Sequence, residues 1–279
     1  MRPEDFQYLS TMLKQKSGLI VNDQKVYLLE SRLMPVARQH NLDGLSGLVE
    51  ALRRPGSDAL VKEVTEAMTT NESFFFRDNT PFDSLKESVL PVMKKSREAK
   101  KSLNIWCAAA SSGQEPYSIS MILKEQEKDW PGWRFNILAT DICTKILKKA
   151  GEGLYSQFEV QRGLPIQMMM KYFTQEGDLW RISPDIRMMV KYQYLNLLDS
   201  LSGLQTFDIV YCRNVLIYFD QETKSQVLFK IRKQMHKDSI LYLGAAETVL
   251  GISDDFKPVK GQRGMYMPSD GDQTPYQKV

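Results

Sequence analysis

The stretch from Leu103 to about Glu127 decides the fold of this chain. It opens with the apolar run Leu103-Asn104-Ile105-Trp106-Cys107, passes through the small residues 108–113 (AAASSG), and continues from Glu115 as a helical pattern. A short strand followed by a small-residue loop that opens a helix brings backbone N–H groups against a ligand in α/β folds. The stretch therefore predicts a strand, a ligand loop and a helix of an α/β domain.

The alternation of strand and helix continues along the chain. Strand patterns cover 135–140, 207–212 and 239–243, and helical patterns run to about Ala150 and over 221–235. This alternation predicts a doubly wound, mostly parallel sheet in an α/β domain at 103–267. The strand–helix alternation is interrupted at about 155–195. Three segments there are typical of short antiparallel strands, namely 171–174, 179–183 and 188–194. We therefore expect a small antiparallel β subdomain inserted there.

The first eighty residues are typical of a bundle of short amphipathic helices. Apolar residues recur at helical spacing in four sets, which span 6–13, 26–36, 45–52 and 60–68. Turn residues separate the sets. We expect an N-terminal helical domain at 1–80, a linker or connecting helix at 81–102, and a polar, frayed tail at 268–279.

Composition excludes several classes of protein. The 279 residues are 42% hydrophobic and 25% charged, as in ordinary globular proteins. The net charge of +3, from 37 Lys+Arg against 34 Asp+Glu, lacks the basic excess of a nucleic-acid or membrane-surface protein. No apolar run reaches the roughly 18–20 residues that cross a bilayer, and the start lacks the apolar core of a signal peptide.

Cysteine and histidine are scarce. The three cysteines form no CxxC pair, so we expect reduced thiols and a cytoplasmic protein. The two histidines leave little material for a histidine-based metal site or a Ser-His-Asp triad. We expect chemistry that needs neither a metal nor an imidazole.

Acidic residues follow the first two predicted strands of the sheet. Glu115 stands where the pyrophosphate of a dinucleotide would lie and would repel it, and no GxGxxG occurs in the chain. Asp141 ends the second strand, where a carboxylate can accept hydrogen bonds from a ribose diol. Either residue can equally be a helix cap. Together they favour a nucleoside ligand without a diphosphate, such as S-adenosylmethionine, although a nicotinamide nucleotide is compatible with this spacing.

Two further segments concentrate polar and aromatic groups. Residues 69–78 (TTNESFFFRD) combine polar side chains, three aromatics and an arginine. Residues 212–219 (CRNVLIYF) place an arginine and an asparagine just past a strand, where ligands of such sheets bind, and a tyrosine four residues later. The simpler interpretation of residues 69–78 is a helix end with a core-filling Phe cluster. That of residues 212–219 is a packed β–α turn.

Six segments, in this order along the chain, carry a resemblance to a known family. They are TTNESFFFRD (69–78), AAASSGQEPYS (108–118), ATDI (139–142), YQYLNLL (192–198), FDIVYCRNVLIYFD (207–220) and LYLGAAE (241–247). Over nearly its whole length the chain resembles the CheR-type chemotaxis receptor methyltransferases. The resemblance implies a helical domain joined to an S-adenosylmethionine-binding, Rossmann-like domain with a small β subdomain. It also implies protein-glutamate O-methyltransferase activity on the cytoplasmic helices of chemoreceptors, with S-adenosylhomocysteine as the second product.

Position by position, the resemblance also implies roles for particular residues. It places cofactor contacts at Asn71, Ser73, Arg77, Ala108, Glu115, Asp141, Asn196, Leu197, Arg213 and Asn214. Arg77 would meet the methionine carboxylate, Glu115 the amino group and Asp141 the ribose hydroxyls. The Asn196-Leu197 pair would contact adenine. Arg77 and Tyr218 lie in the family positions that face the transferred methyl group.

The helical domain and the β subdomain are the predicted docking surfaces for a receptor. Lys25, Arg32 and Arg38 lie in or near the second amphipathic helix, and with the resemblance they predict a surface for an acidic receptor helix. Without it, a solvated helix face is the simpler interpretation. The hairpin loop Gln175–Asp178 is short, which puts in doubt the grip on a receptor's C-terminal peptide that some relatives have. Gln114 replaces the acidic residue usual beside Glu115, which should be tolerated.

Three alternatives come from other classes. A nucleic-acid methyltransferase is disfavoured because no Asn/Asp-Pro-Pro-Tyr/Phe segment and no Pro-Cys pair occurs. A nicotinamide-dependent oxidoreductase is disfavoured by the missing glycine fingerprint and by Glu115. A non-catalytic module that binds S-adenosylmethionine is disfavoured by the retention of both Arg77 and Tyr218.

Overall fold

The computed structural model describes residues 1–276. By their internal contacts the residues group into two units. A helical unit comprises residues 1–70 and 218–223, and an α/β unit comprises residues 71–217 and the chain from Lys224 onward. No helix of the described residues combines the length and the apolar character that crossing a bilayer requires.

The helical unit is built from amphipathic helices around a small core. Its helices are α1 (Pro3–Ser17), α2 (Val26–Gln39), α3 (Gly44–Leu52) and α4 (Asp58–Met68), with a 3-10 turn at Asp23–Lys25. Leu9, Leu29 and Leu48 are fully buried in the core that these helices share. The predicted helical patterns are therefore confirmed, because each apolar set lies on the buried side of one helix.

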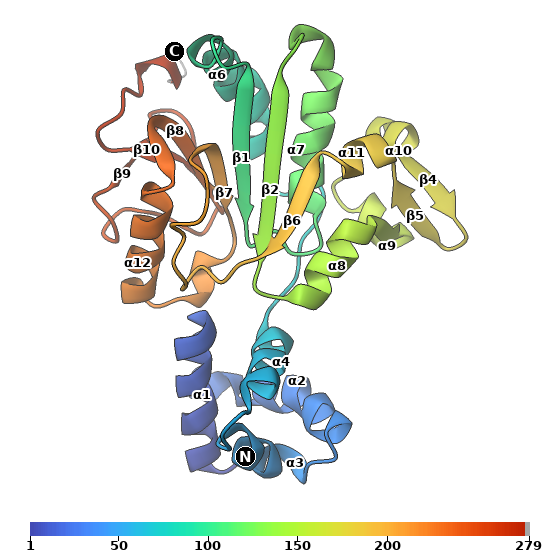
Figure 1. Ribbon diagram of the computed structural model, residues 1–279, viewed down its shortest axis with the longest axis vertical. Coiled ribbons are helices and arrows are strands. Elements are labelled where there is room, and N and C mark those ends of the chain that lie inside the picture. Colours follow the sequence, from blue (N-terminus) through green and yellow to red (C-terminus); the bar gives the residue numbers. More distant parts are fainter. Residues whose placement is uncertain (277–279) are drawn as a thin grey trace. The chain divides into compact units, whose positions relative to one another are not determined.

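The α/β unit is organised around a large sheet with the strand order β6-β2-β1-β7-β8-β10-β9 (Figure 1). The strands are β1 (Ser102–Ala108), β2 (Arg134–Asp141), β6 (Val190–Tyr194), β7 (Phe207–Cys212), β8 (Met235–Leu243), β9 (Phe256–Pro258) and β10 (Met265–Pro268). From β6 to β8 the pairing is parallel, and β10 pairs antiparallel with both of its neighbours. This confirms the doubly wound, mostly parallel sheet. Every residue of β7 is buried, as expected for a parallel strand covered on both faces.

Helices of this unit precede β1 or connect strands. They are α5 (Thr80–Ser84), a π-helical turn (Leu85–Val89), α6 (Leu90–Ser96), α7 (Gln114–Glu125), α8 (Thr144–Glu152) and α12 (Gln221–Arg232). Of these, α7, α8 and α12 connect strands, whereas the others precede β1. Short 3-10 turns lie at Glu127–Asp129, Leu216–Tyr218 and Thr274–Tyr276. The loops that connect β1 to α7 and β2 to α8 leave the sheet at its carboxyl edge.

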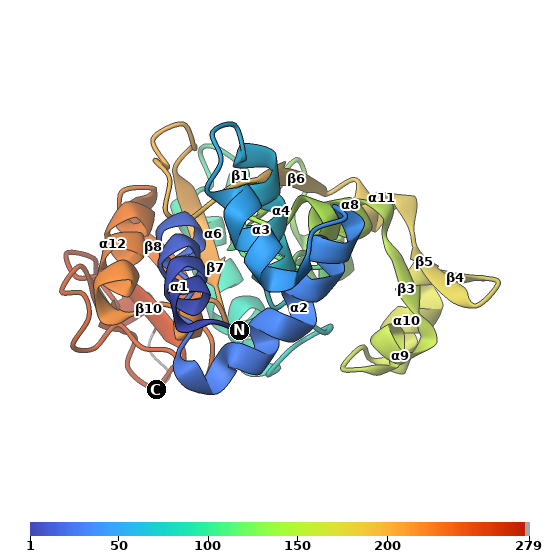
Figure 2. The same ribbon diagram turned by 90° about the horizontal axis from the view of Figure 1, so that it is seen from below.

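A small antiparallel sheet is present in the predicted region, but one of its predicted strands is wrong. Its order is β3-β5-β4, with β3 (Leu154–Ser156), β4 (Phe173–Glu176) and β5 (Leu179–Ile182), and α9 (Gln157–Gln161), α10 (Ile166–Tyr172) and α11 (Pro184–Arg187) accompany it. Figures 1 and 2 show it apart from the large sheet, on the side of α8 and β6. The segment 188–194 instead contributes β6, which pairs parallel with β2. An alternating pattern identifies a strand but does not name its partner.

Both predicted domain boundaries differ from the structure. The helical unit gives way to the α/β unit at Thr70–Asn71, not near residue 80, because Phe75, Phe76 and Phe82 pack in the core of the α/β unit. Residues 81–102 belong to that unit too. The tail is ordered as far as Tyr276, whose buried ring lies in the same core and whose hydroxyl donates a hydrogen bond to the Asp238 carbonyl at 2.9 Å. Residues 277–279 of the predicted frayed tail lie outside the described residues.

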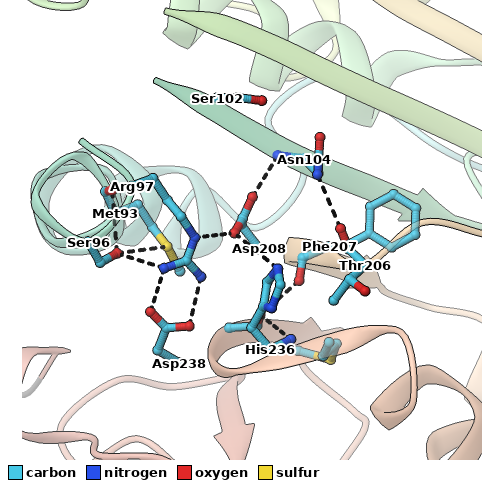
Figure 3. Close-up of polar contacts among 12 residues, drawn as sticks. Met93, Ser96, Arg97, Ser102, Asn104, Thr206, Phe207, Asp208, His236 and Asp238 are labelled. Carbon is cyan, nitrogen blue, oxygen red and sulfur yellow. Dashed lines mark hydrogen bonds and ion pairs between the residues drawn. The ribbon is translucent and has the colours of Figure 1, made fainter. Parts of the chain in front are cut away.

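An ion cluster joins the amino ends of three parallel strands (Figure 3). The Arg97 guanidinium donates to both oxygens of Asp238 at 2.7 Å and to Asp208 at 2.6 Å. Asp208 also accepts the Asn104 N–H at 2.8 Å, and the His236 imidazole lies 4.0 Å from it. The cluster therefore ties the end of α6 to β1, β7 and β8, at the edge of the sheet opposite the carboxyl ends.

Candidate active site

Most of the predicted site residues lie at the carboxyl edge of the large sheet. Ala108 ends β1, Asp141 ends β2 and Arg213 directly follows β7. Asn196 lies two residues past β6, and the N–H of the intervening Leu195 donates to the Asp141 carbonyl at 3.0 Å. Since parallel strands end at the same edge, these residues come together although they are far apart in sequence.

The loop after β1 is held in an unusual backbone conformation. Ala109, Ser111 and Gly113 all have left-handed φ angles, of 61°, 51° and 91°. The Ser111 N–H donates to the Asp141 carboxylate at 2.9 Å, and the Ser111 hydroxyl donates to the Asn71 carbonyl at 2.9 Å. Non-glycine residues in this region cost free energy and tend to occur at functional sites, where surrounding contacts hold them.

The Asp141 carboxylate holds two backbone segments at this edge of the sheet. One carboxylate oxygen accepts the Ser111 N–H, and the other accepts the N–H of Cys143, the residue before α8, also at 2.9 Å. The helix-cap interpretation is therefore right in part. The predicted contact of Asp141 with ribose hydroxyls stays a prediction.

Arg213 is a buried arginine that joins two segments of the site. Its side chain is 2% exposed, and it donates to Glu115 at 2.8 Å, to the Asp78 carboxylate at 2.7 Å and to the Arg77 carbonyl at 2.8 Å. Its Nε has no hydrogen-bond partner within residues 1–276. Arg213 therefore acts as the counterion of Glu115, and its predicted contact with the cofactor stays a prediction.

The carboxyl group of Glu115 is nearly enclosed and lies among charged neighbours. Burial is the largest influence and raises the pKa of its carboxyl group above the ordinary value, whereas the nearby charges of Arg213 and Arg77 oppose this rise. Burial alone would lower the pKa of Arg213, but the attraction of Glu115 and Asp78 leaves that pKa above its ordinary value. The pair thus keeps a carboxylate and two guanidinium groups within electrostatic reach of one another.

The segment 71–79 supplies both polar groups and core packing. Phe75 and Phe76 are buried, so the Phe-cluster interpretation is right for these two rings. Arg77 is half-buried; its guanidinium donates to the Glu72 carbonyl at 3.1 Å and lies 5.4 Å from the centre of the Phe74 ring. Ser73 is half-buried beside them. Phe76, Asp78 and Asn79 have left-handed φ angles, which adds this segment to the strained backbone of the site.

The remaining predicted residues differ in how the structure places them. Asn196 accepts the Leu198 N–H at 3.0 Å, and Leu197 is buried beside it. Asn214 has a φ of 59°, and its N–H donates to Glu247 at 2.8 Å. Tyr218 belongs to the helical unit, where its carbonyl accepts the Ile20 N–H at 3.0 Å. The pairing of Tyr218 with Arg77 in catalysis therefore stays a prediction.

Sequence reasoning missed three polar residues of the site. Asp78 pairs with Arg213, Ser111 joins the loop to both Asn71 and Asp141, and Glu247 accepts hydrogen bonds from the backbone after β7. The signal for Glu247 was its place as the last residue of the segment LYLGAAE, an acidic residue one turn past a buried strand.

Comparison with known families matches both units of the chain. The family model described as "CheR methyltransferase, SAM binding domain" matches residues 71–265, and that described as "CheR methyltransferase, all-alpha domain" matches residues 4–69. The family boundary between 69 and 71 coincides with the boundary between the two contact units.

Curated relatives cover nearly the whole chain. "Chemotaxis protein methyltransferase Cher2" of Pseudomonas putida is 37% identical over 265 residues, which are 94% of this chain and 96% of the relative. "Chemotaxis protein methyltransferase 1" of Pseudomonas aeruginosa is 38% identical with the same coverage of both chains. The "Chemotaxis protein methyltransferase" of Vibrio parahaemolyticus is 35% identical over 94% of this chain and 95% of the relative. The chain therefore belongs to the CheR methyltransferase family.

Proposed function

We propose that the protein transfers a methyl group from S-adenosylmethionine to glutamate side chains on the cytoplasmic helices of chemoreceptors, forming methyl esters for sensory adaptation. The observation that carries the proposal is the charge arrangement around Arg213, which holds Glu115 and the Arg77 backbone at one edge of the sheet. A carboxylate and a guanidinium there match the ammonium and the carboxylate of a methionine-like ligand. The relatives named as chemotaxis methyltransferases support the substrate class.

The residues present fit this cofactor along its length. Arg77 would hold the methionine carboxylate, Glu115 the amino group and Asp141 the ribose hydroxyls. Asn71, Ser73, Ala108, Arg213 and Asn214 would line the same edge, and Asn196 with Leu197 would contact adenine. When bound, S-adenosylmethionine supplies a methyl group on a positively charged sulfur.

The proposed reaction asks little acid–base chemistry of the chain. A glutamate side chain has an ordinary pKa of about 4.3 and is therefore already an anion at pH 7. It needs no general base, which agrees with the scarcity of histidine. The chain must align the carboxylate and exclude water, and positioning alone can lower a barrier by roughly 7–11 kcal/mol. A dry site favours the approach of opposite charges.

The direct test is transfer of labelled methyl groups to membranes that carry chemoreceptors. We expect label on the receptor that is released by base, as a carboxyl methyl ester is. Base-stable label would contradict glutamate as the acceptor. Failure of the chain to bind S-adenosylmethionine in calorimetry would contradict the proposal as a whole. Cofactor binding without transfer to any receptor would favour the non-catalytic module instead.

Tyr218 is the proposed group that orients the incoming carboxylate. Tyr218→Phe removes only the hydroxyl, so we expect an unchanged dissociation constant for S-adenosylmethionine. Loss of one hydrogen bond to a charged group should reduce kcat by about tenfold to a hundredfold. Steady-state methylation of receptor membranes measures this, and turnover near that of the wild type would remove Tyr218 from the mechanism.

Receptor docking is proposed on the exposed cations of α2 and its start, together with the β subdomain. Lys25 and Arg38 are exposed, whereas Arg32 donates to the carbonyls of Met68 and Thr69 at the end of α4, at 2.7 and 3.1 Å. A substitution of Arg32 would therefore also weaken the helical unit, because it leaves carbonyls at a helix end without their donor. The docking test rests on the other two residues.

The double variant Lys25→Glu/Arg38→Glu should raise the KM for receptor at least about tenfold, because it presents like charge to an acidic helix. Cofactor affinity should not change. Arg54→Glu is the matched control, since Arg54 is an exposed arginine of the same unit just past α3. Equal KM values for receptor in the double variant and in the control would contradict docking through these residues. Cys107, Cys143 and Cys212 are buried and form no disulfide among the described residues, which suits the reducing cytoplasm that receptor glutamates would face.

A further inference from the structure

The carboxylate of Glu247 gathers backbone N–H groups at the carboxyl edge of the sheet. In the described part of the chain, one oxygen accepts the N–H groups of Gly244 and Asn214, at 2.6 and 2.8 Å. The other accepts those of Val215 and Ile217, at 2.9 and 3.3 Å. Glu247 is 9% exposed, so these hydrogen bonds to a charged acceptor are largely shielded from water.

These donors come from two neighbouring strand ends. Gly244 directly follows β8, and the other donors lie just past β7. A Cβ atom at Gly244 would lie 2.6 Å from the Asn214 amide nitrogen and 2.8 Å from the Glu247 carboxylate. Only glycine therefore permits this close approach. Asn214, with its left-handed φ of 59°, is held in that conformation by the same carboxylate.

The loop that Glu247 shapes begins with Arg213. Arg213 immediately precedes Asn214, and its guanidinium donates hydrogen bonds to Glu115 and Asp78. We propose that Glu247 is a positioning residue of the cofactor site: by fixing the backbone of residues 214–217, it sets where Arg213 holds Glu115 for the cofactor's amino group. This inference rests on the function proposed above. Glu247 itself need not touch cofactor or substrate.

Charge alone gives the opposite expectation, which makes the role testable. Burial is the main cause of the raised pKa of Glu115, and the negative charge of Glu247 adds to it. Removing that charge without moving the loop would favour the ionised form of Glu115 and strengthen the binding of an ammonium group. Weaker binding in a neutral variant would therefore report a change of geometry.

The test compares Glu247→Gln with the wild-type chain. The amide nitrogen of glutamine cannot accept a hydrogen bond, so two of the backbone N–H groups lose their acceptor. We expect the dissociation constant and the KM for S-adenosylmethionine to rise at least about tenfold, with an unchanged KM for receptor. Glu247→Asp keeps both oxygens on a shorter side chain and should restore part of the affinity.

Asp208→Asn is the matched control. Asp208 is likewise a buried carboxylate that accepts a backbone N–H, that of Asn104, but at the opposite edge of the sheet. We expect it to lower Tm without changing cofactor affinity. Folded Glu247→Gln with wild-type affinity would overturn the positioning role, and so would an equal loss of affinity in Asp208→Asn. These outcomes presuppose that the wild type binds S-adenosylmethionine; if it does not, the proposed function fails first.

Discussion

A single guanidinium, that of Arg213, satisfies two carboxylates and a carbonyl from segments that are far apart in sequence. Taking such charges out of water is costly, and pairing offsets much of that cost. Burial nevertheless leaves the pKa of Glu115 raised, since it outweighs the attraction of the neighbouring guanidinium groups, which lowers that pKa. The ionisation of Glu115 therefore responds to pH above the range of an ordinary glutamate.

Cofactor affinity should follow that ionisation. A protonated Glu115 no longer attracts an ammonium group, so we expect the affinity for S-adenosylmethionine to fall as the pH is lowered through the raised pKa of this carboxyl group. Glu115→Gln should bind about tenfold to a hundredfold more weakly at pH 8 and should lose this pH dependence. Calorimetry across the range measures both. A Glu115→Gln variant that keeps the wild-type pH profile would assign the titration to another group.

At this scale the sequence reveals some site residues and hides others. The positions of Glu115 and Asp141 at the carboxyl edge were predictable because each stands at a fixed offset from a recognisable strand. The role of Asp78 was not predictable. Its partner Arg213 lies 135 residues away, and nothing in the local sequence around an acidic residue indicates so distant a partner. Glu247 lies 30 residues from the nearest donor past β7, the N–H of Ile217.

The start of α7 depends on one glycine. Gly113 has a φ of 91°, and a Cβ atom there would lie 2.5 Å from the Tyr192 hydroxyl and 3.0 Å from the Ala150 side chain. Gly113→Ala should therefore lower the free energy of unfolding by about 2–3 kcal/mol, through backbone strain and overpacking together. It should also weaken cofactor binding, because the loop 109–113 moves. Urea unfolding and calorimetry measure the two effects.

Gly177→Ala separates backbone strain from crowding. Gly177 has a similar left-handed φ of 61° in the turn between β4 and β5, but nothing lies within 4 Å of an added Cβ. We expect a loss of only about 1 kcal/mol and no change in cofactor affinity. Equal losses in the two variants would show that crowding against Tyr192 contributes nothing.

Among the elements, β6 is a strand whose pairing partner the local sequence pattern did not predict. Val190 and Tyr192 are more buried than Lys191 and Gln193, and such a pattern suits a hairpin strand or a parallel edge strand equally. What places it beside β2 is the register from Ile137 with Val190 to Asp141 with Tyr194, which no local pattern contains. The tail predicted to fray packs through the buried ring of Tyr276, a tertiary contact that its polar composition does not indicate.

In the α/β unit, a partly buried ion cluster lies at the edge of the sheet opposite the site. Arg97 and Asp208, whose side chains are 10% and 3% exposed, anchor the ion cluster there (Figure 3). Arg97→Met leaves the buried Asp208 without its main counterion, so we expect the free energy of unfolding to fall by about 3 kcal/mol. Cofactor affinity of the folded variant should not change. A loss below about 1 kcal/mol in urea unfolding would contradict this account.

The same cluster gives the unit a dependence on acid. Hydrogen bonding from Arg97 is the main reason that the pKa of Asp238 lies below its ordinary value of 3.8. The contribution of this group is fully present above that ordinary pKa and is lost as the pH falls through the lowered one. Because Asp238 is partly exposed, solvent screening reduces the contribution. Arg97→Met should show a shallower loss of stability in acid than the wild type, measured by urea unfolding at several pH values.

At the largest scale the presence of a helical part followed by an α/β part was predictable, because the hydrophobic pattern changes along the chain. Helical periodicity in the first part and strand–helix alternation in the rest follow from which faces must be buried. The exact boundary was not predictable, since the rings of Phe75 and Phe76 are as suitable for one core as for another. Their packing in one core with Ile105 is determined by tertiary contacts.

The small sheet begins and ends at one point of the chain's path. The Ile182 N–H donates to the Gly153 carbonyl at 2.9 Å, where Gly153 closes α8. A Cβ atom at Gly153 would lie only 2.6 Å from the Ile182 side chain, so the two strands meet there in close contact. The Tyr155 hydroxyl of β3 donates to the Ser112 carbonyl at 2.8 Å, and the Tyr155 ring packs edge-on against Phe75. An insertion or deletion in the small sheet is therefore transmitted to the loop after β1, so the carboxyl edge of the large sheet and the small sheet must vary together.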